Sequence, residues 1–325
     1  MKKRILSLIV TLTMILSVCA LSSCGEENKK YVIGISQLVT HPALDAATQG
    51  FKDAVIAGLG EENVTFDVQN AESVTDVCAT IANSFVSKKV DLIMANGTAA
   101  LQAAANATLE IPILGTSITE YGVALNIDNF GGTVGGNISG MSDLAPLDKQ
   151  AQLIIDWVKD VKKVGLLYCS AEPNSAYQVK EVKKYLEAKG ITCTEYAFSD
   201  SNDATLNADK AAKENDALYV PTDNTVASCA SAIYGAMTEK KPVIAGEEST
   251  CKGCGIATLT ISYYDLGVAT GKMAAKILKG EEKIEEMPIE YAANFTKKYN
   301  KTICDELGID TAALESAGYV AIVTE

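Results

Sequence analysis

Beginning at Tyr31, the sequence alternates short apolar runs with longer segments in which apolar residues recur at spacings of three and four. This alternation predicts strands that take turns with helices. Such an order folds into a parallel sheet with helices on both faces. In the first part of the chain we expect strands at 31–36, 64–69, 90–95 and 111–114, and helices at 42–58, 73–88 and 98–108.

The alternation stops between residues 116 and 146 and then starts again. Glycines cluster in the interruption between Gly131 and Gly140, which we interpret as a flexible crossing. Beyond it we expect strands at 163–168, 191–196, 217–220, 242–245 and 255–261, and helices at 149–158, 173–189, 203–213, 224–239 and 264–278. The sequence therefore predicts an α/β protein with two doubly wound parallel-sheet lobes joined by a hinge.

The end of the chain indicates a return to the first lobe. Residues 290–295 alternate like an edge strand, and 300–307 have the pattern of a short helix. We therefore expect an N-terminal lobe at 31–144, a C-terminal lobe at 145–280, and a segment at 281–325 that crosses back and completes the N-terminal lobe. Crossings between paired α/β domains are natural hinges around a cleft.

The first residues are typical of an export signal. A basic start, Met1-Lys-Lys-Arg, precedes an apolar stretch over 5–21, as in a secretory signal peptide. The stretch ends in Leu21-Ser-Ser-Cys24, which resembles the lipobox of bacterial lipoproteins. Residues 1–23 would then be removed, Cys24 would carry diacylglycerol, and 24–30 would tether the fold to the outer face of the cell membrane. An uncleaved anchor helix and a plain signal peptide are the alternatives.

The charge balance argues against a nucleic-acid partner. The chain has 28 basic and 41 acidic side chains, a formal net charge of −13. Removal of the segment with Lys2, Lys3 and Arg4 leaves 25 basic against 41 acidic side chains, a net charge of −16. Binding a polyanion requires a basic surface that displaces its counterions, so we expect no nucleic acid.

Seven cysteines follow Cys24, and among them only Cys251-Lys-Gly-Cys254 forms a closely spaced pair. A C-x-x-C can be a redox pair, half of a zinc site or a local disulfide. Zinc normally takes four ligands, and the sequence has no second C-x-x-C and no histidine nearby. The pair precedes the strand expected at 255–261 instead of opening a helix. We therefore expect a structural loop, with or without a disulfide, and no metal.

Candidate ligand-binding residues lie in the loops after the expected strands, because ligands of open α/β sheets bind outside the carboxyl ends of the strands. In the first half of the chain they are Gln37, Leu38, Thr40, His41, Thr98, Thr116 and Ser117. In the second half they are Asn174, Ser175, Asp223, Asn224 and Glu247. These loops are rich in hydroxyls, amides and carboxylates and poor in Lys and Arg, which suits a small polar or zwitterionic ligand.

The candidates fall into two groups according to the charge of the ligand group that they can bind. Backbone N–H groups at the helix starts near Thr98, Asn174 and Asn224 can bind a carboxylate. Asp223 or Glu247 can pair with an ammonium group. The alternative for each residue taken singly is that it is a helix N-cap or a turn residue.

The sequence does not predict an enzyme. His41 is the only histidine, and no G-x-S-x-G, G-x-x-x-x-G-K-[ST] or G-x-G-x-x-G is present. We therefore expect neither catalysis nor a cofactor. A cell-surface hydrolase that uses His41 is the enzymatic alternative.

Several longer segments carry a family resemblance. They are Gln37-Leu-Val-Thr-His-Pro-Ala-Leu-Asp45, Thr98-Ala-Ala, Gly140-Met-Ser-Asp143, Gly165-Leu-Leu-Tyr-Cys-Ser-Ala-Glu-Pro-Asn-Ser175, Val220-Pro-Thr-Asp-Asn-Thr225, Ala245-Gly-Glu247 and Tyr263-Tyr-Asp-Leu-Gly267. Together they resemble ABC transporter substrate-binding lipoproteins of the aromatic amino acid, or tryptophan-binding, type. The resemblance covers nearly all of the chain after the signal.

The resemblance implies a type I periplasmic-binding-protein fold with a ligand between two lobes. It also implies delivery of that ligand to a membrane permease and its ATPase. The expected function is therefore that of an extracytoplasmic solute receptor for an amino acid, with an aromatic one expected. A surface sensory lipoprotein that uses the same clamshell for signalling is the alternative.

The sequence departs from the family pattern at two places. Similar sequences often have Asp where this chain has Ser262, and Thr-Asp-Pro where it has Thr119-Glu-Tyr121. A changed carboxylate near the hinge would alter how an ammonium group or a side chain of the ligand is recognised.

Overall fold

The computed structural model describes residues 30–323. The signal peptide expected at 1–23, the lipid site Cys24 and most of the tether at 24–30 lie outside the described residues. Within 30–323, no helix is long and apolar enough to span a bilayer.

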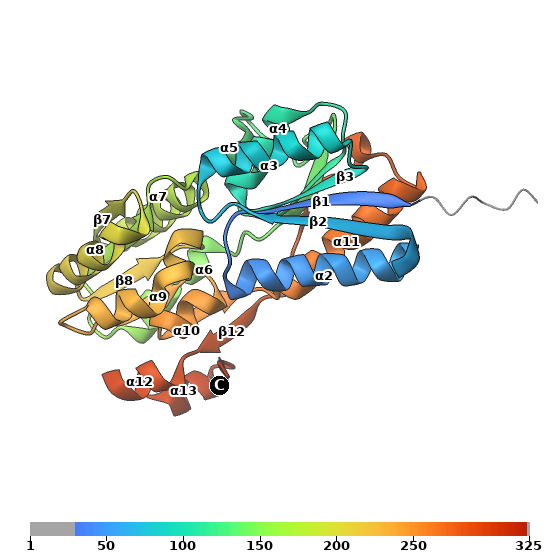
Figure 1. Cartoon of the computed structure of the whole chain (residues 1–325). Helices are drawn as coiled ribbons and strands as arrows, with labels where there is room; N and C mark the ends of the chain where they lie inside the picture. Colours follow the sequence, from blue (N-terminus) through green and yellow to red (C-terminus); the bar gives the residue numbers. More distant parts are fainter. Residues whose placement is uncertain (1–29, 324–325) are drawn as a thin grey trace, which may run out of the picture.

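The N-terminal lobe is built on a six-stranded sheet in which all paired strands are parallel (Figure 1). Its order is β11-β5-β4-β3-β1-β2. The strands are β1 (Tyr31–Gln37), β2 (Val64–Asn70), β3 (Leu92–Asn96), β4 (Ile113–Ile118), β5 (Ile138–Ser142) and β11 (Glu290–Tyr291). The helices are α2 (Pro42–Leu59), α3 (Thr75–Lys88), α4 (Thr98–Ala107), α5 (Tyr121–Leu125) and α11 (Tyr263–Lys279), with 3-10 turns η1 (Glu61–Asn63) and η2 (Ile284–Glu286).

Side chains of this sheet alternate between two apolar layers, because successive residues of a strand point to opposite faces. In β3, Leu92 and Met94 join the layer beneath α2 and α11, whereas Ile93 and Ala95 join the layer beneath α3 and α4. Figure 1 shows the two helix pairs on opposite sides of the sheet. Both faces are therefore covered, as the alternation of strands and helices predicted.

The C-terminal lobe has a seven-stranded sheet of order β13-β12-β10-β9-β8-β6-β7, in which only β12 runs antiparallel to its neighbour β10. The strands are β6 (Lys163–Cys169), β7 (Thr192–Phe198), β8 (Ala217–Val220), β9 (Val243–Ala245), β10 (Ala257–Thr260), β12 (Thr296–Tyr299) and β13 (Val320–Ala321). The helices are α6 (Leu147–Trp157), α7 (Pro173–Ala188), α8 (Ser201–Glu214), α9 (Asn224–Ala236), α10 (Glu248–Cys254), α12 (Lys301–Leu307) and α13 (Thr311–Ser316). The predicted fold class, two parallel α/β lobes, is confirmed.

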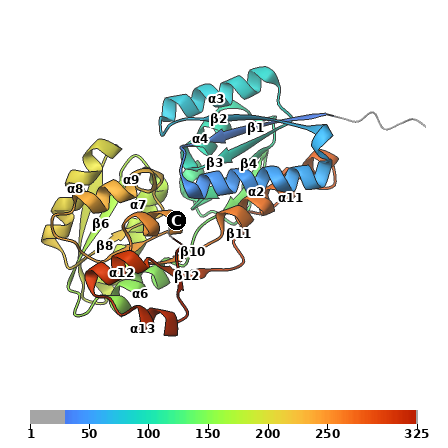
Figure 2. The ribbon, with the colours of Figure 1, turned by 60° about the horizontal axis from the view of Figure 1, so that its bottom comes forward.

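The boundaries predicted for the last third of the chain are wrong. Helix α11 packs along α2 in the N-terminal lobe, so the chain leaves the C-terminal lobe at Ile261 and not after residue 280. Residues 296–321 then belong to the C-terminal lobe, where β12 pairs with β10 and α12 lies near α6 (Figure 2). The chain crosses between the lobes three times, at 143–146, 261–262 and 292–295. Helical periodicity predicts a helix but does not indicate which of the two sheets that helix covers.

The glycine-rich interruption is mostly not a crossing. Gly140 lies inside β5 at φ +145°, and a Cβ there would meet the carbonyl oxygen of Gly115 on β4 at 2.1 Å. Only residues 143–146 pass between the lobes. Gly140 is therefore required by a close approach of two strands, a reason that composition does not reveal.

The loop predicted around the C-x-x-C pair is also wrong, because the pair closes helix α10. Cys251 and Cys254 are both fully buried free thiols, and the other five cysteines of residues 30–323 are free as well. Within that range no group of three or more His, Cys, Asp and Glu side chains is placed to hold a metal ion. The pair belongs to the packing of the C-terminal lobe.

Candidate functional site

A small cavity of about 10 Å³ lies where the two lobes meet. It is lined by His41, Leu44, Ser117, Thr119, Asp143, Asn174, Thr222, Asp223, Asn224, Ala227, Glu247 and Tyr263. Most of these residues follow the carboxyl ends of β1, β4 and β5 in one sheet and of β6, β8, β9 and β10 in the other. The cavity therefore lies where ligands of open α/β sheets bind.

Half of the residues expected at this site line the cavity. These are His41, Ser117, Asn174, Asp223, Asn224 and Glu247. The others do not line it. They are Gln37, Leu38, Thr40, Thr98, Thr116 and Ser175.

The residues outside the cavity have structural contacts instead. Gln37 donates from Nε2 to Asp45 Oδ1 at 2.7 Å, and the Thr40 hydroxyl accepts from Asn70 at 2.7 Å. Thr116 bonds Thr270 of α11 through their hydroxyls at 3.1 Å.

The remaining three are buried. Leu38 belongs to an apolar layer of the N-terminal lobe, and Thr98 is the first residue of α4. Ser175 is fully buried, and its hydroxyl accepts a hydrogen bond from the side-chain amide of Asn174 at 3.4 Å. For these residues the cap or packing interpretation is the one that the structure supports.

His41 connects the two lobes. It precedes α2, whose first residue Pro42 has the fixed φ that suits a helix start. Its Nε2 lies 3.3 Å from Asn224 Oδ1, at the start of α9 in the other lobe. Its Nδ1 is buried without a hydrogen-bond partner among the described residues. The Nε2 atom is thus held against the other lobe, and the Nδ1 atom is available to bond a ligand.

Ser117 is held in a strained conformation at the cavity. Its φ is +54°, where a non-glycine residue is uncommon. The register of β4 against β5 shifts here, between Gly115 and Ile118. The Ser117 hydroxyl is buried and has no partner in the described part of the chain. Strained residues cluster at binding sites because the surrounding structure must hold them there.

Glu172 organises the loops of the C-terminal lobe. Its Oε1 accepts from the backbone N–H and the hydroxyl of Thr225, at 2.8 and 2.7 Å. Its Oε2 accepts from the backbone and side-chain nitrogens of Asn224, at 3.1 and 2.7 Å, and from Asn174 at 3.2 Å. Both carboxylate oxygens are thus occupied, and Asn174 is left with a buried Oδ1 that lacks a partner within 30–323.

Asp223 is the N-cap of α9. Its Oδ1 accepts from the backbone N–H of Val226 at 2.9 Å, and its Oδ2 from that of Cys169 at 2.7 Å. Burial and then the nearby charge of Glu172 raise the pKa of Asp223 well above its ordinary value. The carboxylate lines the cavity, but its hydrogen bonds go to the protein backbone.

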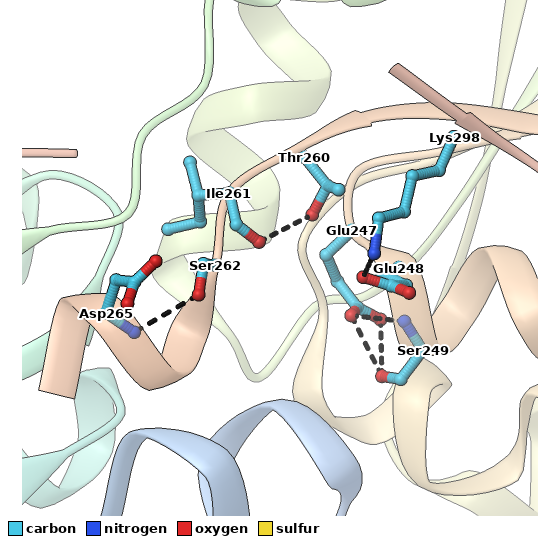
Figure 3. Close-up of polar contacts among 8 residues, drawn as sticks. All are labelled: Glu247, Glu248, Ser249, Thr260, Ile261, Ser262, Asp265 and Lys298. Carbon is cyan, nitrogen blue, oxygen red and sulfur yellow. Dashed lines mark hydrogen bonds and ion pairs between the residues drawn. The ribbon is translucent and has the colours of Figure 1, made fainter. Parts of the chain in front are cut away.

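Glu247 lines the cavity as well, and its carboxylate is likewise bonded to its own helix. Figure 3 shows its carboxylate pointing back onto the start of α10. There it accepts from the backbone N–H and hydroxyl of Ser249, at 2.6 and 2.8 Å, and from the backbone N–H of Thr250. An acidic side chain at a helix N-terminus satisfies free N–H groups and complements the helix dipole.

Asp143 differs from these two carboxylates. It begins the first crossing, and its Oδ2 accepts from the hydroxyl of Tyr263, the first residue of α11, at 3.0 Å. Its Oδ1 is buried and has no hydrogen-bond partner among residues 30–323. Burial raises the pKa of Asp143 to about 6, and the charge of Glu247 adds to the increase. The hydroxyls of Tyr263 and Thr119 oppose it.

The sequence prediction missed Asp143, Tyr263 and Glu172. Asp143 follows β5, a strand hidden by the glycines around it, and Tyr263 follows β10. The strand β5 was not predicted, so the loop with Asp143 was not selected. The strand at 255–261 was predicted, but the residues directly after it were not included among the candidates. Glu172 lies in a loop that was selected, but no local pattern indicates that its carboxylate binds the next loop.

We expect stability to depend on the ionisation of Asp143. Its pKa is about 6 in the folded protein against an ordinary value of 3.8. Between these values the folded state holds a proton that the unfolded state has lost, so the free energy of unfolding falls as the pH rises. The fall is about 3 kcal/mol between about pH 4 and pH 6. Urea unfolding of the ligand-free protein across this range should show it, and Asp143→Asn should remove that part of the pH dependence. Parallel curves for the two proteins would contradict it.

The two departures from the family pattern fall at helix N-caps. Ser262 accepts the backbone N–H of Asp265 at 3.2 Å and caps α11 (Figure 3). Glu120 accepts from the backbone of Gly122 at 3.1 Å and of Val123, and caps α5. Ser and Asp serve comparably as N-caps, and neither Ser262 nor Glu120 lines the cavity. The expectation that these changes alter ligand recognition finds no support in their contacts.

Comparison with known proteins places the chain among transport proteins. Residues 32–317 match the family model of the ABC transporter substrate binding protein. A protein named tyrosine-binding protein from Clostridioides difficile (strain R20291) is 35% identical over 307 residues, which cover 88% of this chain and 87% of that protein.

Two solved structures are similar over 90% of this chain and 100% of theirs. One is an ABC domain in complex with L-Trp from Streptococcus pneumonia, with 34% identity and a TM-score of 0.85. The other is the ligand-free, open structure of a substrate binding protein with adhesive properties from Clostridium difficile, with 36% identity and a TM-score of 0.68. At nearly equal identity, the arrangement of this chain is closer to the L-Trp complex than to the open structure. The chain belongs to the ABC transporter substrate-binding protein family.

Proposed function

We propose that the protein captures an aromatic amino acid between its lobes and presents it to the permease and ATPase of an ABC importer. The relative named as a tyrosine-binding protein and the relative solved with L-Trp support an aromatic ligand. We further propose that Cys24 carries the lipid that holds the protein at the outer face of the cell membrane. The support for the anchor is the lipobox resemblance of Leu21-Ser-Ser-Cys24.

One observation carries the proposal of a polar ligand. Four buried polar atoms without partners in the described structure belong to residues that line one cavity: His41 Nδ1, Ser117 Oγ, Asp143 Oδ1 and Asn174 Oδ1. They come from both lobes and from the first crossing. Each such group costs about 1–3 kcal/mol when nothing bonds to it. A ligand that bonds to all four recovers this free energy only when the lobes are closed, so binding and closure are coupled.

The charge of the lining residues narrows the class of ligand further. The cavity is lined by the carboxylates of Asp143, Asp223 and Glu247 and by no Lys or Arg. That balance favours a ligand with a positive group. Leu44 and Ala227 supply apolar surface. A zwitterionic amino acid supplies that positive group, whereas an uncharged sugar or a nucleotide with its phosphates does not.

Thermal unfolding against a ligand panel tests the proposal. The chain from Gly25 onward, refolded to remove carried ligand, is heated with tryptophan, tyrosine, phenylalanine, other amino acids, sugars and nucleosides. A ligand at about 100 times its dissociation constant stabilises the fold by about 2.7 kcal/mol, so we expect a clear rise in Tm confined to aromatic amino acids. Ala227→Leu, which fills the cavity from α9, should abolish the response. A rise with sugars or nucleosides alone would overturn the proposed ligand.

A further inference from the structure

We propose that Asp143 binds the α-ammonium group of the ligand, and that Tyr263 positions its carboxylate for this contact. The inference rests on the proposed function and assigns one recognition role within it. Three carboxylates line the cavity, and the sequence pointed to the other two, Asp223 and Glu247. Their hydrogen bonds distinguish them from Asp143.

Asp223 and Glu247 are both occupied by the protein. Each caps a helix, and each has both of its oxygens bonded to donors of its own lobe. Turning either carboxylate toward a ligand would leave buried backbone N–H groups without acceptors, at about 1–3 kcal/mol each. Their contribution to an ammonium group is therefore their charge, not a direct bond.

In Asp143, one carboxylate oxygen accepts a hydrogen bond from the protein and the other accepts none from the described residues. Tyr263 fixes Oδ2 at 3.0 Å, which sets the rotamer, while Oδ1 stays buried without a partner within residues 30–323. Only 4% of Asp143 is exposed. A carboxylate oriented by one hydroxyl and unpaired at its other oxygen is suited to receive a single strong donor. An ammonium group supplies that donor and the opposite charge.

A second acceptor faces the same cavity from the other lobe. Asn174 Oδ1 is buried and unpartnered in the described chain, because the Asn174 amide nitrogen is bonded to Glu172 and to the carbonyl of Thr222. An ammonium group has three donors, so it can bond both Asp143 and Asn174. Since Asp143 lies at the first crossing and Asn174 on α7, this contact joins the hinge to the C-terminal lobe.

Among the described residues, no cation pairs with Asp143 in place of a ligand. The groups that face Asp143 are the hydroxyls of Tyr263, Thr119 and Tyr121 and the charge of Glu247, with His41 on the same cavity. No ion pair to Asp143 exists within residues 30–323. Burial without a cation raises the pKa of Asp143 to about 6. A bound ammonium group would favour the ionised form, so binding near pH 6 would release a proton from Asp143.

Ligand pairs that differ only in the ammonium group test the assignment. Dissociation constants are measured by titration calorimetry at pH 7.5 for L-tyrosine and L-tryptophan and for their deaminated acids, hydroxyphenylpropionate and indolepropionate. In Asp143→Asn we expect the amino acids to bind about 10- to 100-fold more weakly and the deaminated acids to bind no more weakly than before. Asp265→Asn, an exposed carboxylate on the same helix as Tyr263, is the matched control and should change neither.

Proton release on binding is an independent test of the role of Asp143. At pH 6, amino acid binding to the original chain is measured in buffers of different ionisation enthalpy. We expect release of a fraction of a proton that disappears in Asp143→Asn. His41 lines the same cavity, so the difference between the two proteins is what isolates Asp143.

The outcomes separate this inference from the proposed function. If the original chain binds none of the amino acids, both the proposed function and the role of Asp143 are overturned. If it binds them and Asp143→Asn binds amino acids and deaminated acids with unchanged preference, the function stands and the role of Asp143 is overturned. Equal weakening of both ligand classes, or identical proton release in both proteins, would also overturn it.

Discussion

Gly267→Ala is expected to lower the free energy of unfolding by about 3 kcal/mol or more. Gly267 lies where α11 crosses α2, and an added Cβ would stand 2.0 Å from the carbonyl oxygen of Ala47. Gly50 on α2 has the reciprocal contact, 2.1 Å from the carbonyl oxygen of Tyr264. The obstacle on each side is helix backbone and not a flexible side chain, so the helices must separate. Urea unfolding followed by circular dichroism measures the loss.

Gly235→Ala is the matched control. Gly235 also lies in a helix, α9, but nothing stands within 4 Å of the position that its Cβ would take. Alanine costs less conformational entropy than glycine in a helix, so this variant should be about 0.5–1 kcal/mol more stable. If Gly267→Ala unfolded within about 1 kcal/mol of the original chain, the close packing of α2 on α11 would be wrong.

Glu172→Gln is expected to weaken binding of the aromatic amino acid more than tenfold and to lower the free energy of unfolding by about 3 kcal/mol. Glu172 accepts five hydrogen bonds from Asn174, Asn224 and Thr225. Glutamine replaces one acceptor oxygen with an NH₂ group that faces these donors. Asn174 and Asn224 both line the cavity, so the loss of their common anchor should reach the ligand. Calorimetric titration and urea unfolding measure the two effects.

Glu187→Gln makes the same chemical change on the exposed face of α7. It should leave both affinity and stability within about 0.5 kcal/mol of the original. Unaltered affinity in Glu172→Gln would show that the start of α9 holds its position without this carboxylate, and would remove Glu172 from the description of the site.

Local periodicity predicted the strands and helices closely: the strand expected at 217–220 is β8 (Ala217–Val220), and the helix expected at 173–189 is α7. Periodicity is a property of neighbouring residues, so the sequence contains it directly. The rule that ligands bind at strand carboxyl ends predicted His41, Ser117 and Asn174, and these three residues line the cavity.

The tertiary structure decided what depends on distant partners. The sequence by itself determined the α/β class, the two lobes, the acidic net charge and the loops from which a binding site could form. It did not determine that α11 packs on α2, that Gly140 allows β5 to approach β4, or that Asp223 and Glu247 direct their oxygens to their own helices while Asp143 keeps one free. Each of these depends on atoms that lie far apart in the chain and come together in the fold. A carboxylate can bond a ligand only where protein donors have not already occupied its oxygens.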